Sequence, residues 1–182
     1  AGEDYHVVGG EFSGETLSWI KEKITEGVQK GKLVFGMLHH GLVEHFTGQS
    51  VFPVTSEYVI KDWDEISNEF ALLGMNIVFT GHFHSMDVVK RINGENFIFD
   101  IETGSTVSYP CSFRVVNLTA DKKINISSHK ITSINYDTGG IPFQEYAKDQ
   151  IEINGKDLAE FVLIDQLQFP VEDAEKMAPV FI

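Results

Sequence analysis

The chain has 182 residues, of which 42% are hydrophobic and 12% aromatic, and this composition excludes a disordered protein and predicts one soluble globular domain. The formal net charge of −13 excludes general binding to nucleic acid or to an anionic membrane surface. No apolar stretch approaches the roughly 18 residues of a membrane span, and the single cysteine, Cys111, excludes an internal disulfide and a cysteine-rich zinc site. The compartment stays open: the protein is cytoplasmic or exported, and any targeting signal would lie upstream.

The first eighty residues predict a strand–helix–strand unit. Residues 13–30 have apolar side chains at helical spacing after Ser13, a good N-cap residue. The short apolar run 33–38 predicts a buried strand, 62–73 a second amphipathic helix, and 76–80 a second strand. This order is typical of a parallel βαβ unit, in which ligands bind outside the carboxyl ends of the strands.

The rest of the chain predicts a meander followed by a helical tail. Residues 86–133 contain short, partly alternating segments separated by turn signals, so we expect antiparallel strands that complete a mixed sheet. Helical patterns return in the acidic tail, most clearly over 155–168 and again over 171–177. We therefore expect an α/β fold in which residues 1–135 form the main domain and residues 136–182 pack on it as a mostly helical tail.

Both predicted strands end in histidines. The segment "VFGMLHHGL" (34–42) ends in His39 and His40, and "FTGHFHSMD" (79–87) carries His82 and His84. If the second segment is extended, the side chains of His82 and His84 point to one side of the chain. Neutral imidazole is the commonest metal ligand near pH 7. From the residues alone, a metal site and ordinary hydrogen-bonded histidines remain equally open.

The motifs "GHFH" and "MLHHG" resemble the last two signatures of the calcineurin-like metallophosphoesterase superfamily. The stretches "HHGLVEHF" and "ETGSTVSYP" are also similar to a bacterial branch of it, and the resemblance spans about residues 15–118. It implies the second half of an αββα sandwich and hydrolysis of phosphoesters by metal-activated hydroxide at a dinuclear site. It further implies His39 and His82 as ligands of one metal ion and His84 as a ligand of the other.

Three further residues border the same loops and are candidates for contact with substrate or with the metal ligands: His40, His45 and Asp87. The resemblance leaves the metal identity open among manganese, iron, zinc and nickel. The expected substrate is a small-molecule phosphoester, a monoester or a diester, that the sequence does not identify.

Three earlier signatures of the superfamily are not found in this sequence: an Asp-x-His that follows a buried strand, Gly-Asp-x-x-Asp, and Gly-Asn-His. We interpret Asp4-Tyr5-His6 as a coincidence, because no buried strand precedes it. The absent blocks supply the carboxylate that bridges the two ions and the histidine that serves as acid or base. We therefore expect at most one weakly bound ion here, an inactive chain on its own, and a parent enzyme whose other half lies upstream or on a separate polypeptide.

This interpretation has a packing consequence. The inner face of the predicted sheet, with Val34, Phe35, Ile77 and Phe79, would lack the facing sheet of the superfamily fold. Because such apolar faces are rarely left in water, we expect either the missing half of the fold or a second copy of the chain to cover it.

Two other functions remain as alternatives. The first is a non-catalytic, degenerate member of the fold that acts as a binding or scaffold module. The second is a mononuclear zinc protein that uses His39, His82 and His84, which predicts tight stoichiometric zinc. The three missing blocks upstream of Ala1 would favour the enzyme, and their absence there would favour the scaffold.

Overall fold

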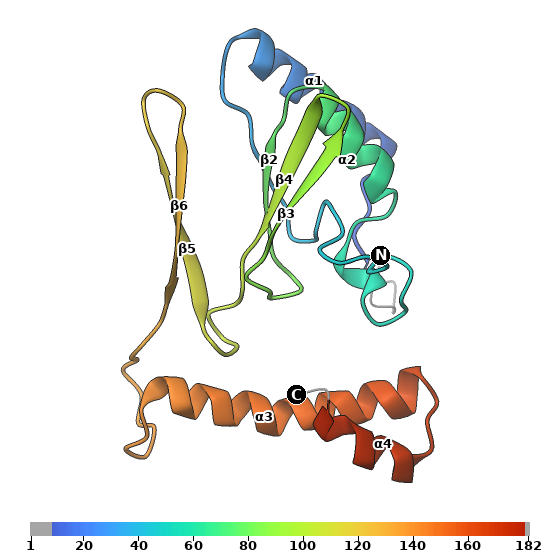
Figure 1. Ribbon diagram of the computed structural model, residues 1–182, viewed down its shortest axis with the longest axis vertical. Coiled ribbons are helices and arrows are strands. Elements are labelled where there is room, and N and C mark those ends of the chain that lie inside the picture. Colours follow the sequence, from blue (N-terminus) through green and yellow to red (C-terminus); the bar gives the residue numbers. More distant parts are fainter. Residues whose placement is uncertain (1–8, 181–182) are drawn as a thin grey trace, which may run out of the picture. The chain divides into compact units, whose positions relative to one another are not determined.

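The computed structural model describes residues 9–180 and divides into two compact units (Figure 1). The first unit comprises residues up to Gly104 together with Val116–Ile126, and the second comprises Ser105–Val115 and Ser127–Ile182. The main elements in chain order are α1 (Gly14–Gln29), β1 (Gly36–Met37), α2 (Trp63–Leu72), β2 (Ile77–Thr80), β3 (Val88–Asn93), β4 (Asn96–Glu102), β5 (Ser112–Leu118), β6 (Ile124–Lys130), α3 (Phe143–Phe161) and α4 (Val171–Met177).

Both predicted helices of the first unit are confirmed. The Ser13 hydroxyl accepts a hydrogen bond from the Thr16 amide at 3.1 Å, which caps α1 as expected. The predicted strand over 33–38 shortens to two residues in β1. In the register Gly36↔Val78, residues 33 and 34 lie opposite residues 75 and 76, which precede β2, so the start of the predicted strand has no partner.

The main sheet has the order β1-β2-β4-β3, with β1, β2 and β4 parallel and β3 antiparallel to β4. The βαβ unit is thus confirmed, and β3 and β4 complete a mixed sheet as expected. The continuation of the meander is wrong: β5 and β6 form a separate two-stranded sheet. Most side chains of β5 and β6 are exposed on both faces, so apolar burial does not fix either strand in a larger sheet.

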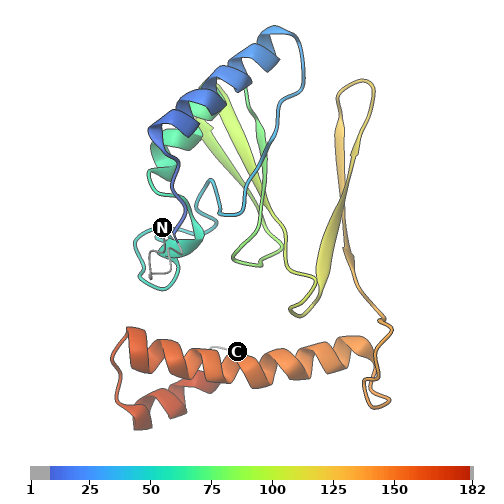
Figure 2. The same ribbon diagram turned by 180° about the vertical axis from the view of Figure 1, so that it is seen from behind.

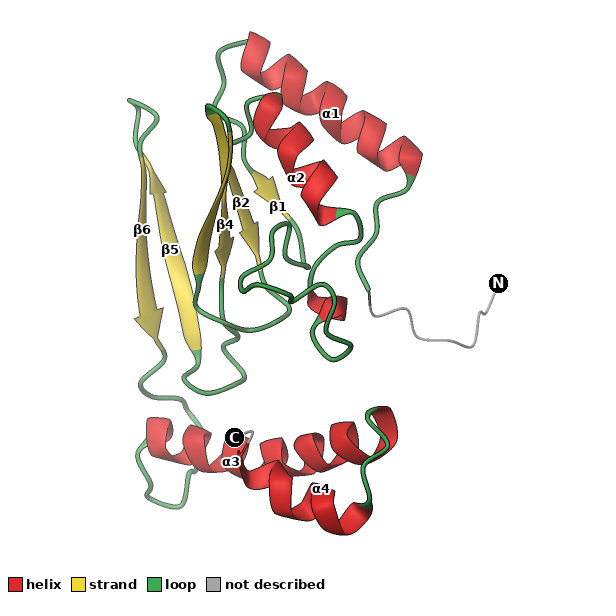
Figure 3. Cartoon of the chain, turned by 45° about the vertical axis from the view of Figure 1, so that its right-hand side comes forward, coloured by secondary structure: helices red, strands yellow, loops and turns green. Residues whose placement is uncertain are grey.

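Helices α1 and α2 cover one face of the main sheet (Figure 3). The core between them contains Ile24, Phe70, Val78 and Ile98. Val34 packs against this core, so its predicted place on the other face is wrong. The expectation holds for the remainder of that face, which is apolar and incompletely covered. Its members are Phe35, Met37, Ile77, Phe79, Phe97 and Phe99.

The second unit contains a helical hairpin. Helix α3 begins earlier than predicted and runs through a π-helical turn, Val162–Gln166, before Pro170 and the predicted segment 171–177, which is α4. Figure 2 shows α4 folded back along α3. Leu163, Ala174 and Ala178 form the small core between them. The packing of this tail on the first unit stays a prediction. No helix within residues 9–180 has the length and apolar character needed to cross a membrane.

Candidate functional site

The parallel pairing of β1 with β2 continues past the ends of both strands. The Leu38 amide donates to the Phe79 carbonyl at 3.1 Å, and the Gly81 amide donates to the His39 carbonyl at 3.1 Å. This ladder carries the loop after β1 and the loop after β2 side by side. The carboxyl ends of the two strands therefore bring the two histidine motifs together, as the βαβ pattern predicts.

Three imidazole rings form a compact group that we call the histidine cluster: His39, His40 and His82. The ring centroids of His39 and His82 lie 4.4 Å apart, and those of His40 and His82 lie 4.6 Å apart. Tyr58 packs against the other side of His82, with a centroid separation of 4.8 Å. His39 and His40, from the end of β1, thus lie against His82, from the loop after β2.

The Gly-His-x-His segment is bent, and the expectation of an extended segment is wrong. His82 and His84 have φ angles of 70° and 60°, whereas Gly81 is not among the residues with positive φ. The Phe83 amide donates to the Gly81 carbonyl at 2.9 Å, which closes the bend. The His84 side chain in this bend is exposed to solvent. Two histidines therefore adopt the left-handed conformation that ordinarily favours glycine.

The environment of His82 keeps its ring neutral. Burial is the main cause, and electrostatic interaction with the neighbouring imidazoles of His40, His39 and His84 adds to it, so that the pKa of His82 falls to about 4. At neutral pH the ring therefore has a nitrogen lone pair available for a cation or a hydrogen-bond donor.

The imidazoles of the cluster are suitable ligands for a metal ion, but they do not make up a complete set of ligands. With a metal–nitrogen distance of about 2.1 Å, two imidazoles on one ion have centroids about 4.5–5.2 Å apart, close to the separations found here. Within residues 9–180, however, no group of three or more His, Cys, Asp or Glu side chains is arranged to hold a metal ion. Asp4 and His6 lie outside the described residues. The predicted ligand set of His39, His82 and His84 stays a prediction.

His45 and Asp87 form a partly buried contact between the two loops. The His45 ring is only 3% exposed, and its Nδ1 lies 2.9 Å from Asp87 Oδ2. Two carboxylates that the sequence analysis missed face its other nitrogen. His45 Nε2 lies 3.5 Å from Glu102 Oε2 and 3.6 Å from Asp100 Oδ1. We call these four side chains the acidic quartet: His45, Asp87, Asp100 and Glu102.

The two missed carboxylates anchor both histidine loops. Asp100 Oδ2 accepts from the amides of Leu42 and Val43 at 2.7 and 3.0 Å, and Asp100 Oδ1 accepts from the Thr80 hydroxyl. Glu102 Oε1 accepts from the Ser85 amide at 3.2 Å. Both carboxylates are fully buried.

A sequence signal for this role existed in "NFIFDIE". In a strand with period two, Asp100 and Glu102 share the inward face with Ile98. An acidic side chain on a buried strand face needs a partner, which is the signal that marks these two positions.

Two members of the quartet, His45 and Glu102, both have raised pKa values, for different reasons. Burial opposes the charged form of His45, but the nearby carboxylates of Asp100 and Asp87 favour it and outweigh the burial, so the pKa of His45 rises. Burial raises the pKa of Glu102, although the nearby His45 charge works against this rise. The electrostatic interaction between His45 and Glu102 therefore favours the charged form of each.

Glycines allow close backbone approach around the histidines. A Cβ added at Gly10 would lie 2.7 Å from Cγ of His40, so the His40 ring covers Gly10 directly. A Cβ at Gly104 would lie 3.1 Å from the His84 carbonyl. Gly10 and the first two histidines also line a cavity of about 270 Å³ together with Leu38 and Ile60.

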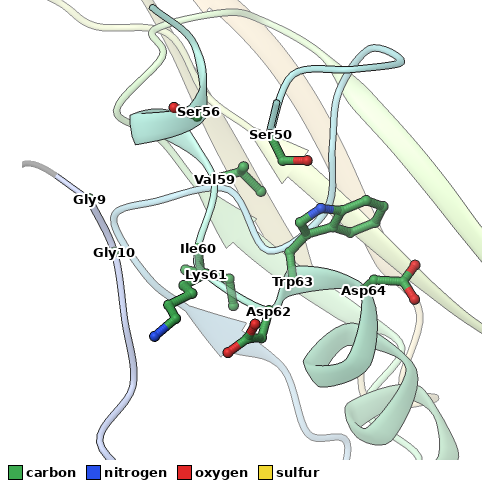
Figure 4. A pocket seen from close by; sticks show the side chains of 10 residues that line it. All are labelled: Gly9, Gly10, Ser50, Ser56, Val59, Ile60, Lys61, Asp62, Trp63 and Asp64. Carbon is green, nitrogen blue, oxygen red and sulfur yellow. The ribbon is translucent and has the colours of Figure 1, made fainter. Parts of the chain in front are cut away.

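A larger cavity of about 440 Å³ also has Gly10 in its lining (Figure 4). The close-up shows Lys61, Asp62, Trp63 and Asp64 at its edge. None of the residues predicted for the metal site lines it. Its mixed charges do not favour one ligand class.

Comparisons with known proteins add no assignment, because no family model matches the chain and the search of curated proteins gives no match.

Proposed function

We propose that the chain is the carboxyl-terminal portion of a metal-dependent phosphoesterase, in which His39, His82 and His84 hold divalent ions. The observation that carries the proposal is the convergence of two histidine motifs at the carboxyl ends of adjacent parallel strands. The rings of His39 and His82, 43 positions apart in the sequence, lie 4.4 Å apart at this edge. A low pKa at His82 supports a ligand role, since only the neutral ring can donate a lone pair.

Bound divalent ions would polarise a phosphoryl oxygen and lower the pKa of an attacking water. The residues of this chain hold and orient the ligands. Tyr58 packs on the His82 ring, and the ladder through Gly81 fixes its backbone beside His39. The bridging carboxylate and the acid or base histidine would come from a segment that carries the other superfamily blocks, so this chain alone would be inactive.

Metal titration of the purified chain tests the ligand assignment. We expect zinc or manganese to bind with a stoichiometry of at most one and with weak affinity, because neutral histidines bring no negative charge to the ion. His82→Ala should abolish this binding. His129→Ala is the matched control, because His129 is exposed and pairs with Ser127 on β6. Equal metal affinity in wild type and His82→Ala would contradict the ligand assignment.

Hydrolysis assays test the enzymatic part of the proposal. The intact protein, with manganese, iron, zinc or nickel added in turn, should hydrolyse a nitrophenyl phosphate monoester or diester. His39→Ala should lower kcat by several orders of magnitude. An intact protein that carries all five signatures and hydrolyses neither ester with any of the metals would count against phosphoesterase activity.

A binding or scaffold module is the second candidate. It is favoured by one observation: the part of the chain from residue 9 to residue 180 presents no group arranged to hold a metal ion. A scaffold predicts that His39→Ala and His82→Ala leave the biological role of the protein intact. A scaffold needs no metal ion, whereas the enzyme does. The metal titration described above therefore separates the two candidates before any substrate is known.

The incompletely covered sheet face gives a separate expectation about association. Met37 is 77% exposed and Phe35 is 44% exposed on this face. We propose that two copies of the chain associate through it when no other polypeptide covers it. Sedimentation should show a dimer that Met37→Lys dissociates, and a monomer at high concentration would refute the association.

A further inference from the structure

The geometry around His45 defines the protonation state of its ring. A carboxylate only accepts hydrogen bonds, so His45 Nδ1, at 2.9 Å from Asp87 Oδ2, carries a proton. On the far side of the ring, Nε2 is buried and has no hydrogen-bond partner within the described residues. It faces carboxylate oxygens of Glu102 at 3.5 Å and Asp100 at 3.6 Å.

When Glu102 and Asp100 are both ionised, an unprotonated Nε2 would be repelled in this position. Its lone pair would point at two carboxylate oxygens, whose own lone pairs carry negative charge. With a proton on Nε2, the same separations become attractive, and in a buried site that attraction is strong. The ring is therefore favoured as an imidazolium with protons on both nitrogens.

The quartet connects both histidine loops through this one ring. His45 belongs to the loop after β1, whereas Asp87 belongs to the loop after β2. Asp100 holds the first loop at Leu42, and Glu102 holds the second at Ser85. His45 lies against all three carboxylates, so its charge offsets a concentration of negative charge that otherwise destabilises both anchors.

We infer that His45 is a positioning residue: as a buried imidazolium it locks the loop of His39 and His40 to the loop of His82 and His84. Within the described residues, the polar contacts of its ring are with Asp87, Asp100 and Glu102 and not with the rings of the histidine cluster. Its role in positioning metal ligands rests on the proposed function, but its charge and its coupling of the two loops do not.

The first test is the protonation state of the wild-type ring at pH 7. Nitrogen-15 NMR of the histidine imidazoles distinguishes a doubly protonated ring from a neutral one. We expect both nitrogens of His45 to be protonated. Because the pKa of His45 is raised, its stabilising effect is complete below about pH 6.5 and is lost as the pH rises through the folded-state value. A neutral His45 at pH 7 would overturn the inference.

The second test removes the charge. In His45→Gln, amide hydrogen exchange should accelerate by about one to two orders of magnitude at Leu42 and Val43 in one loop and at Ser85 in the other. His129→Gln is the control and should leave these rates unchanged. Acceleration in only one loop, or in neither, would overturn the coupling.

The third test restores the charge balance. Adding Glu102→Gln to His45→Gln removes one carboxylate along with the imidazolium, so exchange at Leu42 and Val43 should return to within about tenfold of wild type. A ring that acts only by filling space predicts no recovery, and that result would overturn the electrostatic role. If His45→Gln does not fold, the double variant and the wild-type NMR measurement still decide.

Zinc affinity provides the readout for positioning. His45→Gln should weaken zinc binding by about 10- to 100-fold, the range found when groups that orient metal ligands are removed. If wild type binds no zinc, the proposed metal site fails while the NMR and exchange results still decide the role of His45. If wild type binds zinc and His45→Gln binds it equally well, the positioning role is refuted.

Discussion

Replacing Asp100 with alanine should destabilise the first unit more than any other single change around the site. The carboxylate is fully buried and accepts hydrogen bonds from the Leu42 amide at 2.7 Å and the Val43 amide at 3.0 Å. Both donors belong to buried residues. Each buried amide that loses its acceptor costs about 1–3 kcal/mol, so the two together cost about 2–6 kcal/mol.

The graded variant Asp100→Asn separates the two contributions of this side chain. Its amide oxygen can still accept from Leu42 and Val43, but its NH2 group would face Thr80 and His45 without a negative charge. We expect a loss of about 1–2 kcal/mol for Asp100→Asn and of about 4 kcal/mol for Asp100→Ala, against a total stability of about 5–15 kcal/mol.

Urea unfolding followed by tryptophan fluorescence measures these losses of unfolding free energy directly, because Trp19 and Trp63 both lie in the first unit. Glu95→Gln is the control, since Glu95 is exposed in the turn between β3 and β4. A loss below about 1 kcal/mol for Asp100→Ala would refute the assigned anchoring role, since it would mean that water or another group satisfies both amides.

Three further predictions follow from the cluster and its backbone. In metal-free protein, NMR titration should show His82 neutral down to about pH 5, since its pKa is lowered to about 4. The stability that the neutral ring contributes is complete above about pH 6.5 and falls as the pH drops toward 4. His84→Gly should match or exceed wild type in thermal stability. His84→Val should lose about 1–2 kcal/mol, because the φ of 60° disfavours branched side chains; a melting temperature of His84→Val equal to that of wild type would contradict this. Gly10→Ala should cost about 1–3 kcal/mol and shift the His40 ring resonances, since its Cβ would lie 2.7 Å from His40 Cγ; unchanged resonances would show that the two positions do not touch.

Local patterns in the sequence were sufficient for the helices and for the parallel pairing. The cap at Ser13 and the apolar spacing of α1 and α2 depend on neighbouring residues, and both predictions are confirmed. The strand ends that bring His39 and His82 together also follow from the βαβ order. These features depend on nearby residues or on a strong topological rule.

Features that depend on distant partners escaped prediction. The length of β1 depends on where β2 begins, and the separate pairing of β5 with β6 depends on burial that the sequence pattern does not encode. The bend at His82 and His84 contradicts the usual preference of L-residues, so the identities of these residues give no signal for it. Asp100 and Glu102 become meaningful only once their amide partners, 17 and more positions away, are known.

The backbone ladder through Gly81 and the His39 carbonyl has a consequence for engineering. Because main-chain hydrogen bonds hold the strand ends side by side, and Asp100 and Glu102 anchor the loops that follow, the histidine side chains can be exchanged for other donors while these contacts stay in place. Carboxylates placed at positions 40 or 84 would test whether the two strand ends can hold other sets of metal ligands. The fold already places a pair of imidazoles side by side there.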